Sequence, residues 1–342
     1  MAGAQSVGLG IKPAKFDEVY DPSTTNSHSV TITNLDGTDK KLYVFAKNVA
    51  SVGAGGVPVF ANSNDEVTGY EVADWIKIPY TEIDVPGDGK FTVDFTIDVP
   101  ENATPGSHLG GLFFSVEPPD LSGSGAAVGY QVASIVSIII SGDVNEAANI
   151  RQFSTSKFIY GSQNIDFSVK IENTGNVVVR PVGPLEIFNM LGNKVGSVMF
   201  NSDRATVVPR FVDGAGNVKS DGTRIFNDIV WEGNSVGFGR YEAIVSPAYG
   251  ELGAKKTMSS TVTFWILPMH IIGPALGVLA VLLLLVFIFV RLYIKRSLAH
   301  LNQGRRIVSR RRKNGSSAFL LVTVISLTVT ALFLIVLLAL FA

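Results

Sequence analysis

Hydrophobic and polar residues alternate in short runs over residues 1–270, and no long stretch has the 3.6-residue period of a helix. Such alternation, interrupted by clusters of Gly, Asn, Asp and Pro, is typical of an all-β sandwich. The strands predicted from it are Ser29–Thr33, Lys41–Lys47, Phe91–Val99, Gly111–Val116 and Gln131–Ser141, and then Phe158–Tyr160, Asn164–Ile171, Leu185–Asn189, Gly196–Phe200, Ile225–Trp231, Tyr241–Ser246 and Met258–Leu267. The pattern restarts after Gly142-Asp143, which predicts a boundary near residues 143–150.

An internal repeat supports two β units. Val30-Thr31-Ile32-Thr33-Asn34 aligns with Val169-Lys170-Ile171-Glu172-Asn173, so each strand ends on an Asn. An Asn at a strand end bonds its own backbone two residues on and turns the chain. We therefore predict two immunoglobulin-like β-sandwiches, at residues 7–145 and 146–268, with structural roles for Asn34 and Asn173.

The C-terminal part of the chain has a different pattern. Residues 271–290 contain no charged or hydrogen-bonding side chain, and residues 318–342 are interrupted only by Thr and Ser. Twenty helical residues span about 30 Å, the thickness of the hydrocarbon core of a bilayer. Both runs are predicted transmembrane helices, with two buried core helices as the less favoured alternative.

A basic cluster lies at residues 291–317, between the two apolar runs. Its members are Arg291, Lys295, Arg296, Arg305, Arg306, Arg310, Arg311, Arg312 and Lys313. Because Lys and Arg collect in cytoplasmic loops, we expect this segment inside the cell membrane and residues 1–270 outside. Such a cluster also attracts anionic lipid, so membrane lipid is an expected partner.

Charge also bears on the ectodomain. Setting aside the nine basic residues beyond position 290 leaves 19 basic and 29 acidic side chains in residues 1–270, a balance of −10. A surface of that sign repels nucleic acid and suits a basic protein partner. Ala2-Gly3-Ala4 has the small-x-small form of a cleavage site, so residues 1–6 are interpreted as the remainder of a signal-cleavage region.

Short motifs in both units resemble WxL-interacting cell-surface proteins. In the first unit they are Val30–Asn34, Trp75-Ile76 and Pro105–Phe114, and in the second Ile171–Asn176 and Gly239-Arg240-Tyr241. The resemblance implies a secreted protein with two immunoglobulin-like domains and a C-terminal membrane helix. It implies peptidoglycan binding by the first domain and protein binding by the second. The second apolar run departs from that family, which has one span.

Candidate catalytic chemistry is sparse. The chain has no Cys and four scattered His, and it lacks both the His-Glu-x-x-His zinc motif and a phosphate-binding loop. We expect no enzymatic activity and no cofactor. Calcium is the ion that oxygen-rich loops favour, at Asp213, Asn217 and Asp221 or at residues 62–66, although turn formation explains both clusters better.

The most unusual local feature is His108 followed by Gly110-Gly111 at the start of an apolar strand. Paired Gly residues there indicate a bulge or a close backbone approach. A ligand groove formed by His108, Gly110, Gly111 and Trp75 is one interpretation, and a strand packed under a loop is the favoured alternative. Trp75 is expected to be a core anchor rather than a sugar platform.

Two functions follow from these observations. The first is a membrane-anchored binding or scaffolding protein of the cell surface, whose partner is a surface or envelope protein or peptidoglycan. The second is an envelope assembly factor that captures strands of exported subunits, as two-domain pilus chaperones do. Strand addition at an exposed sheet edge needs no particular side-chain motif, so sequence alone does not separate the two.

Overall fold

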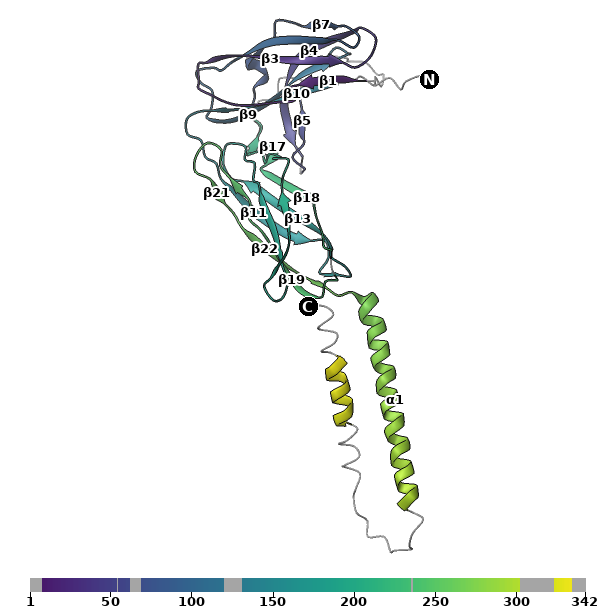
Figure 1. The fold of residues 1–342 in the computed structure, drawn as a ribbon. Helices are drawn as coiled ribbons and strands as arrows, with labels where there is room; N and C mark the ends of the chain where they lie inside the picture. Colours follow the sequence, from purple (N-terminus) through teal and green to yellow (C-terminus); the bar gives the residue numbers. More distant parts are fainter. Residues whose placement is uncertain are drawn as a thin grey trace.

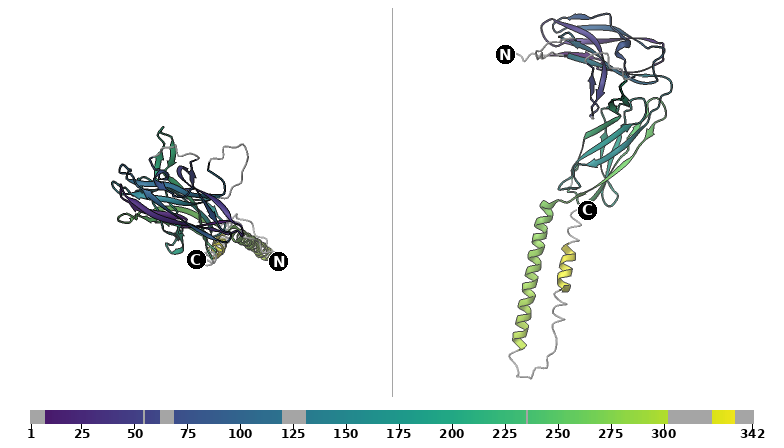
Figure 2. Two further views of the ribbon diagram at one scale, coloured as in Figure 1. Left: turned by 90° about the horizontal axis from the view of Figure 1, so that it is seen from above. Right: turned by 180° about the vertical axis from the view of Figure 1, so that it is seen from behind.

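The computed structural model describes residues 8–53, 55–61, 69–119, 131–234, 236–301 and 323–333. Two β regions lie end to end, and a long helix leaves the far end of the second one (Figure 1). The side and end views agree on this elongated shape (Figure 2). The predicted all-β fold of residues 1–270 is confirmed as two sandwich-like β regions.

The first region contains two sheets. One has the order β1-β3-β8-β6, and the other has the order β2-β10-β9-β4-β5 with β7 also paired to β4. The elements are β1 Leu9–Lys12, β2 Lys15–Tyr20, β3 Thr25–Asn34, β4 Lys40–Val52, β5 Pro58–Phe60, a 3-10 turn η1 Ala73–Trp75, β6 Ile76–Lys77, β7 Glu82–Val85, β8 Lys90–Asp98, β9 Gly106–Ser115 and β10 Gln131–Ile140.

The second region repeats this plan. Its sheets have the orders β11-β13-β18 and β12-β22-β19-β14-β15, and two small hairpins, β16-β17 and β20-β21, flank them. The strands are β11 Ala148–Thr155, β12 Ile159–Tyr160, β13 Asn164–Asn173, β14 Gly183–Phe188, β15 Lys194–Phe200, β16 Arg210–Val212, β17 Val218–Asp221, β18 Thr223–Glu232, β19 Gly239–Val245, β20 Ala248–Tyr249, β21 Lys256–Thr257 and β22 Ser260–Ile266.

Each region has its own hydrophobic core between its two sheets. In the first, Phe95 on β8 meets Phe114 on β9 within one buried cluster. In the second, Phe167 on β13 packs with Phe264 on β22, their ring centroids 5.9 Å apart. Side chains that alternate along both facing sheets fill these cores, as the period-two pattern predicts.

The two repeat asparagines have the predicted structural role. Asn34 donates to the carbonyl oxygen of Thr38 at 2.8 Å and accepts from the Asp36 amide at 3.1 Å. Asn173 donates to the carbonyl oxygens of Val177 and Val207 at 2.7 and 2.9 Å and accepts from the Gly175 amide. Both side chains are buried, so each turn is tied internally rather than by water.

Helix α1 runs from Met269 to Leu301, and its residues Met269–Arg296 are long and apolar enough to cross a bilayer. It therefore extends past the predicted end of the first span, and Arg291, Lys295 and Arg296 lie on the helix rather than in a loop. The other six basic residues of the cluster lie outside the described residues. Of the second predicted span the structure describes a short helix, Thr323–Phe333, so a second crossing stays a prediction.

Candidate functional site

The residues of the predicted ligand groove lie together beneath a loop. The rings of His108 and Trp75 are 4.5 Å apart, centroid to centroid. His108 is 3% exposed, and its ring nitrogens lie 3.0 and 2.9 Å from the carbonyl oxygens of Glu71 and Thr104. Since the protein's own backbone occupies both nitrogens, the ring has a clear structural role, and ligand binding there stays a prediction.

Gly110 and Gly111 mark a close backbone approach, one of the two predicted alternatives. A Cβ on Gly110 would lie 2.5 Å from Val72 Cγ1, and one on Gly111 would lie 2.8 Å from Phe60 Cε1. The pairings of β9 with β10 and with β4 continue through both positions without a shift in register, so no bulge occurs there. The strand is pressed under neighbouring side chains, and only Gly fits.

The candidate calcium residues form turns. Asp213 accepts hydrogen bonds from the amides of Ala215 and Asn217 and from the Asn217 side chain, which holds the pKa of its carboxyl below the usual value. Asp221 accepts from the amide and hydroxyl of Thr223. Within the described ranges, no group of three His, Asp or Glu is placed to hold a metal ion. Asn62, Asn64, Asp65 and Glu66 lie outside the described residues.

One catalytic-type pattern is present in the chain, at Gly233-Asn234-Ser235-Val236-Gly237. In hydrolases, Gly-x-Ser-x-Gly forms a sharp turn between a strand and a helix. Here the segment connects strand β18 to strand β19, which is a different context, and Ser235 lies outside the described residues. The pattern therefore gives no support to a nucleophile.

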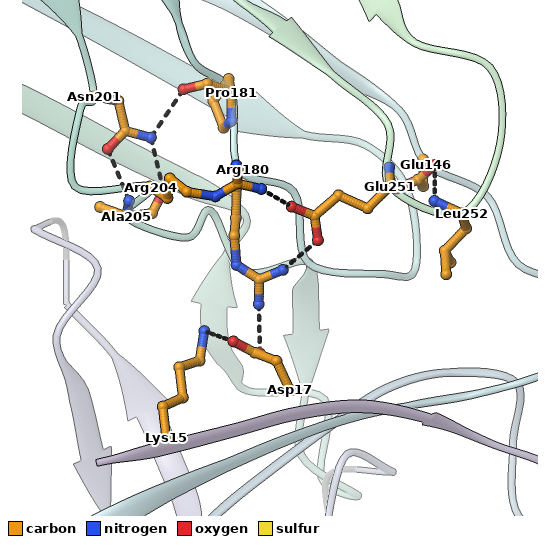
Figure 3. A network of polar contacts seen from close by, with 10 residues as sticks. All are labelled: Lys15, Asp17, Glu146, Arg180, Pro181, Asn201, Arg204, Ala205, Glu251 and Leu252. Carbon is orange, nitrogen blue, oxygen red and sulfur yellow. Dashed lines mark hydrogen bonds and ion pairs between the residues drawn. The ribbon is translucent and has the colours of Figure 1, made fainter. Parts of the chain in front are cut away.

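A network of charges joins the two β regions (Figure 3). Arg180 of the second region binds Asp17 on β2 of the first at 2.5 Å and Glu251 at 2.6 Å, while only 9% of its side chain is exposed. Lys15 binds the other oxygen of Asp17 at 2.8 Å, and Arg204 binds Glu251 at 2.6 Å. Because burial dominates at Lys15, its pKa lies below the usual value.

Apolar contacts reinforce this junction. Val49 and Leu109 of the first region form one buried cluster with Val178, Val208 and Phe211 of the second. The Val178 amide also donates to the Ser107 hydroxyl at 2.8 Å. A buried cluster together with a buried cation therefore ties the two sandwiches to each other.

A cavity of about 310 Å³ lies within the junction, between apolar side chains and Lys15, Ser137 and Arg224. Among the described residues, the Ser137 hydroxyl and Arg224 Nε are buried and have no hydrogen-bond partner. Arg224 donates through Nη1 to the Thr206 carbonyl at 2.8 Å, and burial lowers the pKa of its guanidinium. Some of the buried hydrogen-bonding groups at this point of the junction therefore lack a partner within the described residues.

One open backbone edge belongs to β15. This strand pairs with β14 on one side, and no strand of the described chain pairs with its other side. Val195 is 39% and Met199 58% exposed on the outer face, with Ser197 between them. On the inner face, a Cβ on Gly196 would lie 2.3 Å from Trp231 Nε1, so the indole of Trp231 packs directly against the strand.

Sequence reasoning placed a strand at residues 196–200 but assigned it no role. Its free edge depends on the order of strands in the sheet, which no local pattern encodes. The one sequence feature that indicates such an edge is the lack of charged residues from Val195 to Phe200. Likewise, Arg180 is the only charged residue in a stretch of Val and Pro. Such an isolated Arg indicates an ion pair, but the sequence does not identify the acidic partners.

No family model matches the chain, and no curated protein matches it, so the WxL-interacting resemblance stays a prediction. Among solved structures, the class 5 fimbriae chaperone CfaA is similar at 14% identity and a TM-score of 0.37, over 76% of this chain and 100% of its own. The Pseudomonas aeruginosa CupB2 chaperone has 11% identity and a TM-score of 0.31, over 73% and 98%. The E. coli chaperone DraB has 10% and 0.31, over 74% and 96%. These are remote resemblances to PapD-like sandwiches, and at these scores they carry no functional argument.

Proposed function

We propose that the chain is a membrane-anchored binding protein of the cell envelope, without catalytic activity, that holds an extended segment of a partner protein by β-strand addition at β15. The observation that carries the proposal is the outer edge of this strand, which no strand of the described chain pairs with and which has no charged residue from Val195 to Phe200. Helix α1 anchors the protein, and the junction at Arg180 keeps the edge in a fixed orientation above the membrane.

Edge strands are normally protected against pairing with other chains by charge, by bulges or by short length. Strand β2 carries Lys15, Asp17 and Glu18, and β1 has four residues. Strands β11 and β18 each contain a register shift, and β18 also carries three charged residues, whereas β11 carries one. Strand β15 has seven residues and one charge, Lys194, which is paired with Glu186 at 2.5 Å. Its own register shift lies at its first residues, between Lys194 and Gly196, and its pairing with β14 is regular from Gly196 to Phe200.

The same geometry describes the partner. An added strand takes its affinity from main-chain hydrogen bonds and its specificity from alternate side chains. Those side chains would lie beside Val195 and Met199, which are two side-chain repeats of the strand apart on its outer face. The partner segment is therefore extended, about five to seven residues long, and apolar at every second position.

The test uses the full chain in lipid nanodiscs and a synthetic peptide of alternating Val and Thr with a Lys at each end. We expect the peptide to bind and to slow amide hydrogen exchange over residues 194–200. V195K and M199K place a charge on the edge and are expected to weaken binding at least tenfold, or about 1.4 kcal/mol. V218K is the matched control, because Val218 is 53% exposed on another strand.

Equal binding by all three variants, or protection elsewhere in the chain, would show that β15 is not the site. The sequence also predicts peptidoglycan as an alternative partner. Retention of the protein on purified cell wall tests that alternative. Retention that is unchanged in V195K and M199K, without peptide binding, would favour a wall component as the ligand.

A further inference from the structure

Exposed apolar side chains gather at the end of the second sandwich from which α1 emerges. Six of them come from four separate segments, and they are Phe158 (63% exposed), Ile159 (52%), Met190 (52%), Leu191 (68%), Val236 (48%) and Trp265 (39%). Isolated exposed apolar residues are common, but a group of this kind marks an interaction surface.

The strand pairings place these segments at one end. Ile159 lies opposite Trp265 where β12 runs parallel to β22. The sulfur of Met190 lies 2.8 Å from the Cβ position of Gly239, which in turn lies opposite Ile266. Val236 lines a cavity of about 330 Å³ together with Pro268 and His270 at the start of α1. The start of β12 and the loops after β14 and β18 therefore lie at the end where β22 leads into α1. Figure 1 shows α1 leaving the second sandwich at the end near the labels of β19 and β22.

Cations accompany the apolar group. Lys157 precedes Phe158, and Arg240 lies opposite Trp265 in the β19–β22 pair. Both side chains are exposed, and neither forms an ion pair with a described residue. Aromatic and aliphatic side chains beside unpaired cations suit the interface of a bilayer, where acyl chains meet phosphate groups.

From these observations we infer that the base of the second sandwich is a lipid-contacting surface, seated in the outer interface of the membrane that α1 crosses. The inference rests on the membrane anchoring in the proposed function. Met269, the first residue of α1, is 63% exposed, and only Ile266 to Pro268 separate it from Trp265. With so short a connection, the bilayer surface lies within reach of the tips. Insertion at the bilayer interface removes their apolar surface from water, which is favourable.

Single-cysteine labelling tests this cleanly, because the natural chain has no Cys. M190C and L191C, each carrying an environment-sensitive NBD label, are reconstituted as full chain into phosphatidylcholine–phosphatidylglycerol vesicles. Acyl chains are brominated in half of the samples. V218C is the control, since Val218 is as exposed as Met190, 53% against 52%, but lies on the hairpin far from α1.

We expect the emission of M190C and L191C to shift to shorter wavelength and to be quenched by the brominated lipid, whereas V218C stays unshifted and unquenched. Vesicle flotation is measured on the same samples. Protein that floats with all three labels equally exposed to water would overturn the lipid-contacting surface and leave the anchor standing. Protein that does not float would overturn both. Peptide binding at β15 is unaffected by either result.

Discussion

The two sandwiches share a topology but end their larger sheets differently. In the first, β4 is followed at the edge by β5 and β7, which are three and four residues long, and β7 carries Glu82 and Asp84. In the second, β14 occupies the place of β4, and the edge is the seven-residue β15. The larger sheet of the first region thus ends in two short strands, and that of the second ends in one longer strand.

The two sandwiches also differ in how far their strands and ends are buried. The strand that corresponds to β19 in the first region is β9, and all ten of its residues are buried. One end of the first region is covered by the second through the Arg180 network, whereas the free end of the second is apolar and exposed. The difference teaches that two copies of one fold, each with its own buried core, can differ in the surfaces that they leave exposed.

The largest effect expected is on the two cores. Phe114→Ala and Phe167→Ala each remove a ring that is 0% and 1% exposed, which typically costs about 3–5 kcal/mol. Urea unfolding followed by hydrogen exchange should show faster exchange chiefly in the sandwich that carries the change. Equal destabilisation of both sandwiches by either variant would show that the two regions unfold as one unit and would remove the division between them.

A smaller effect is expected at the repeated turns. Asn34→Ala and Asn173→Ala leave buried carbonyl oxygens without donors, at about 1–3 kcal/mol each. Asn173 makes the shorter bonds, 2.7 and 2.9 Å against 2.8, 3.2 and 3.3 Å for Asn34, so its loss should cost more. Thermal unfolding of both variants checks the order. Asn227→Ala, at an exposed position, serves as the near-neutral control.

These asparagines show what sequence predicts well. The alternation of Val30 and Ile32, and of Val169 and Ile171, is a local pattern, and so is the Asn that ends each run. The cores and turns follow from such patterns because their partners lie a few residues away or on the facing sheet. The close approach at Gly110-Gly111 is one of the two alternatives that this local pattern predicts, a bulge being the other.

Strands β2 and β11 show where sequence reasoning fails. Charges at three of the six positions of β2 hide its pairing with β10, which lies 120 residues away in the chain. A register shift between Ile150 and Gln152 breaks the alternation of β11. The free edge of β15 and the apolar base near Trp265 arise only when distant segments assemble. Sequence therefore predicted the two β regions and the long apolar helix but not the candidate binding surfaces.

The junction between the sandwiches should respond moderately. Arg180→Met removes a 9%-exposed cation, but Lys15 still binds Asp17 and Arg204 still binds Glu251. We expect a loss of about 1–2 kcal/mol, less than for a fully buried pair. Spin labels on V19C and V218C should then report a broader distance distribution between the regions. Arg204→Met, at a side chain 64% exposed, is the control and should change the stability by less than about 0.5 kcal/mol.

The smallest effect concerns pH and only the first sandwich. His28 packs against Phe16 and Phe95 and is hydrogen-bonded to the hydroxyl of Tyr20, whose own pKa burial raises to about 12. Burial also lowers the pKa of His28 below its usual 6.5, so the unfolded chain binds a proton that the folded chain does not. Stability from this residue is therefore full above about pH 6.5 and is lost as the pH falls toward the lowered value.

His28→Gln should flatten this part of the pH dependence of unfolding, measured between pH 7 and pH 5 by urea titration. Within the described chain, the second sandwich has no His apart from His270, at the start of α1, so its exchange rates provide the internal control. A loss of stability on acidification that persists in the variant, or that falls equally on both sandwiches, would assign the effect to carboxylates instead. The contrast between the regions would then hold for their edges and ends but not for their response to acid, since Asp17 and Glu251 tie both regions to one shared network.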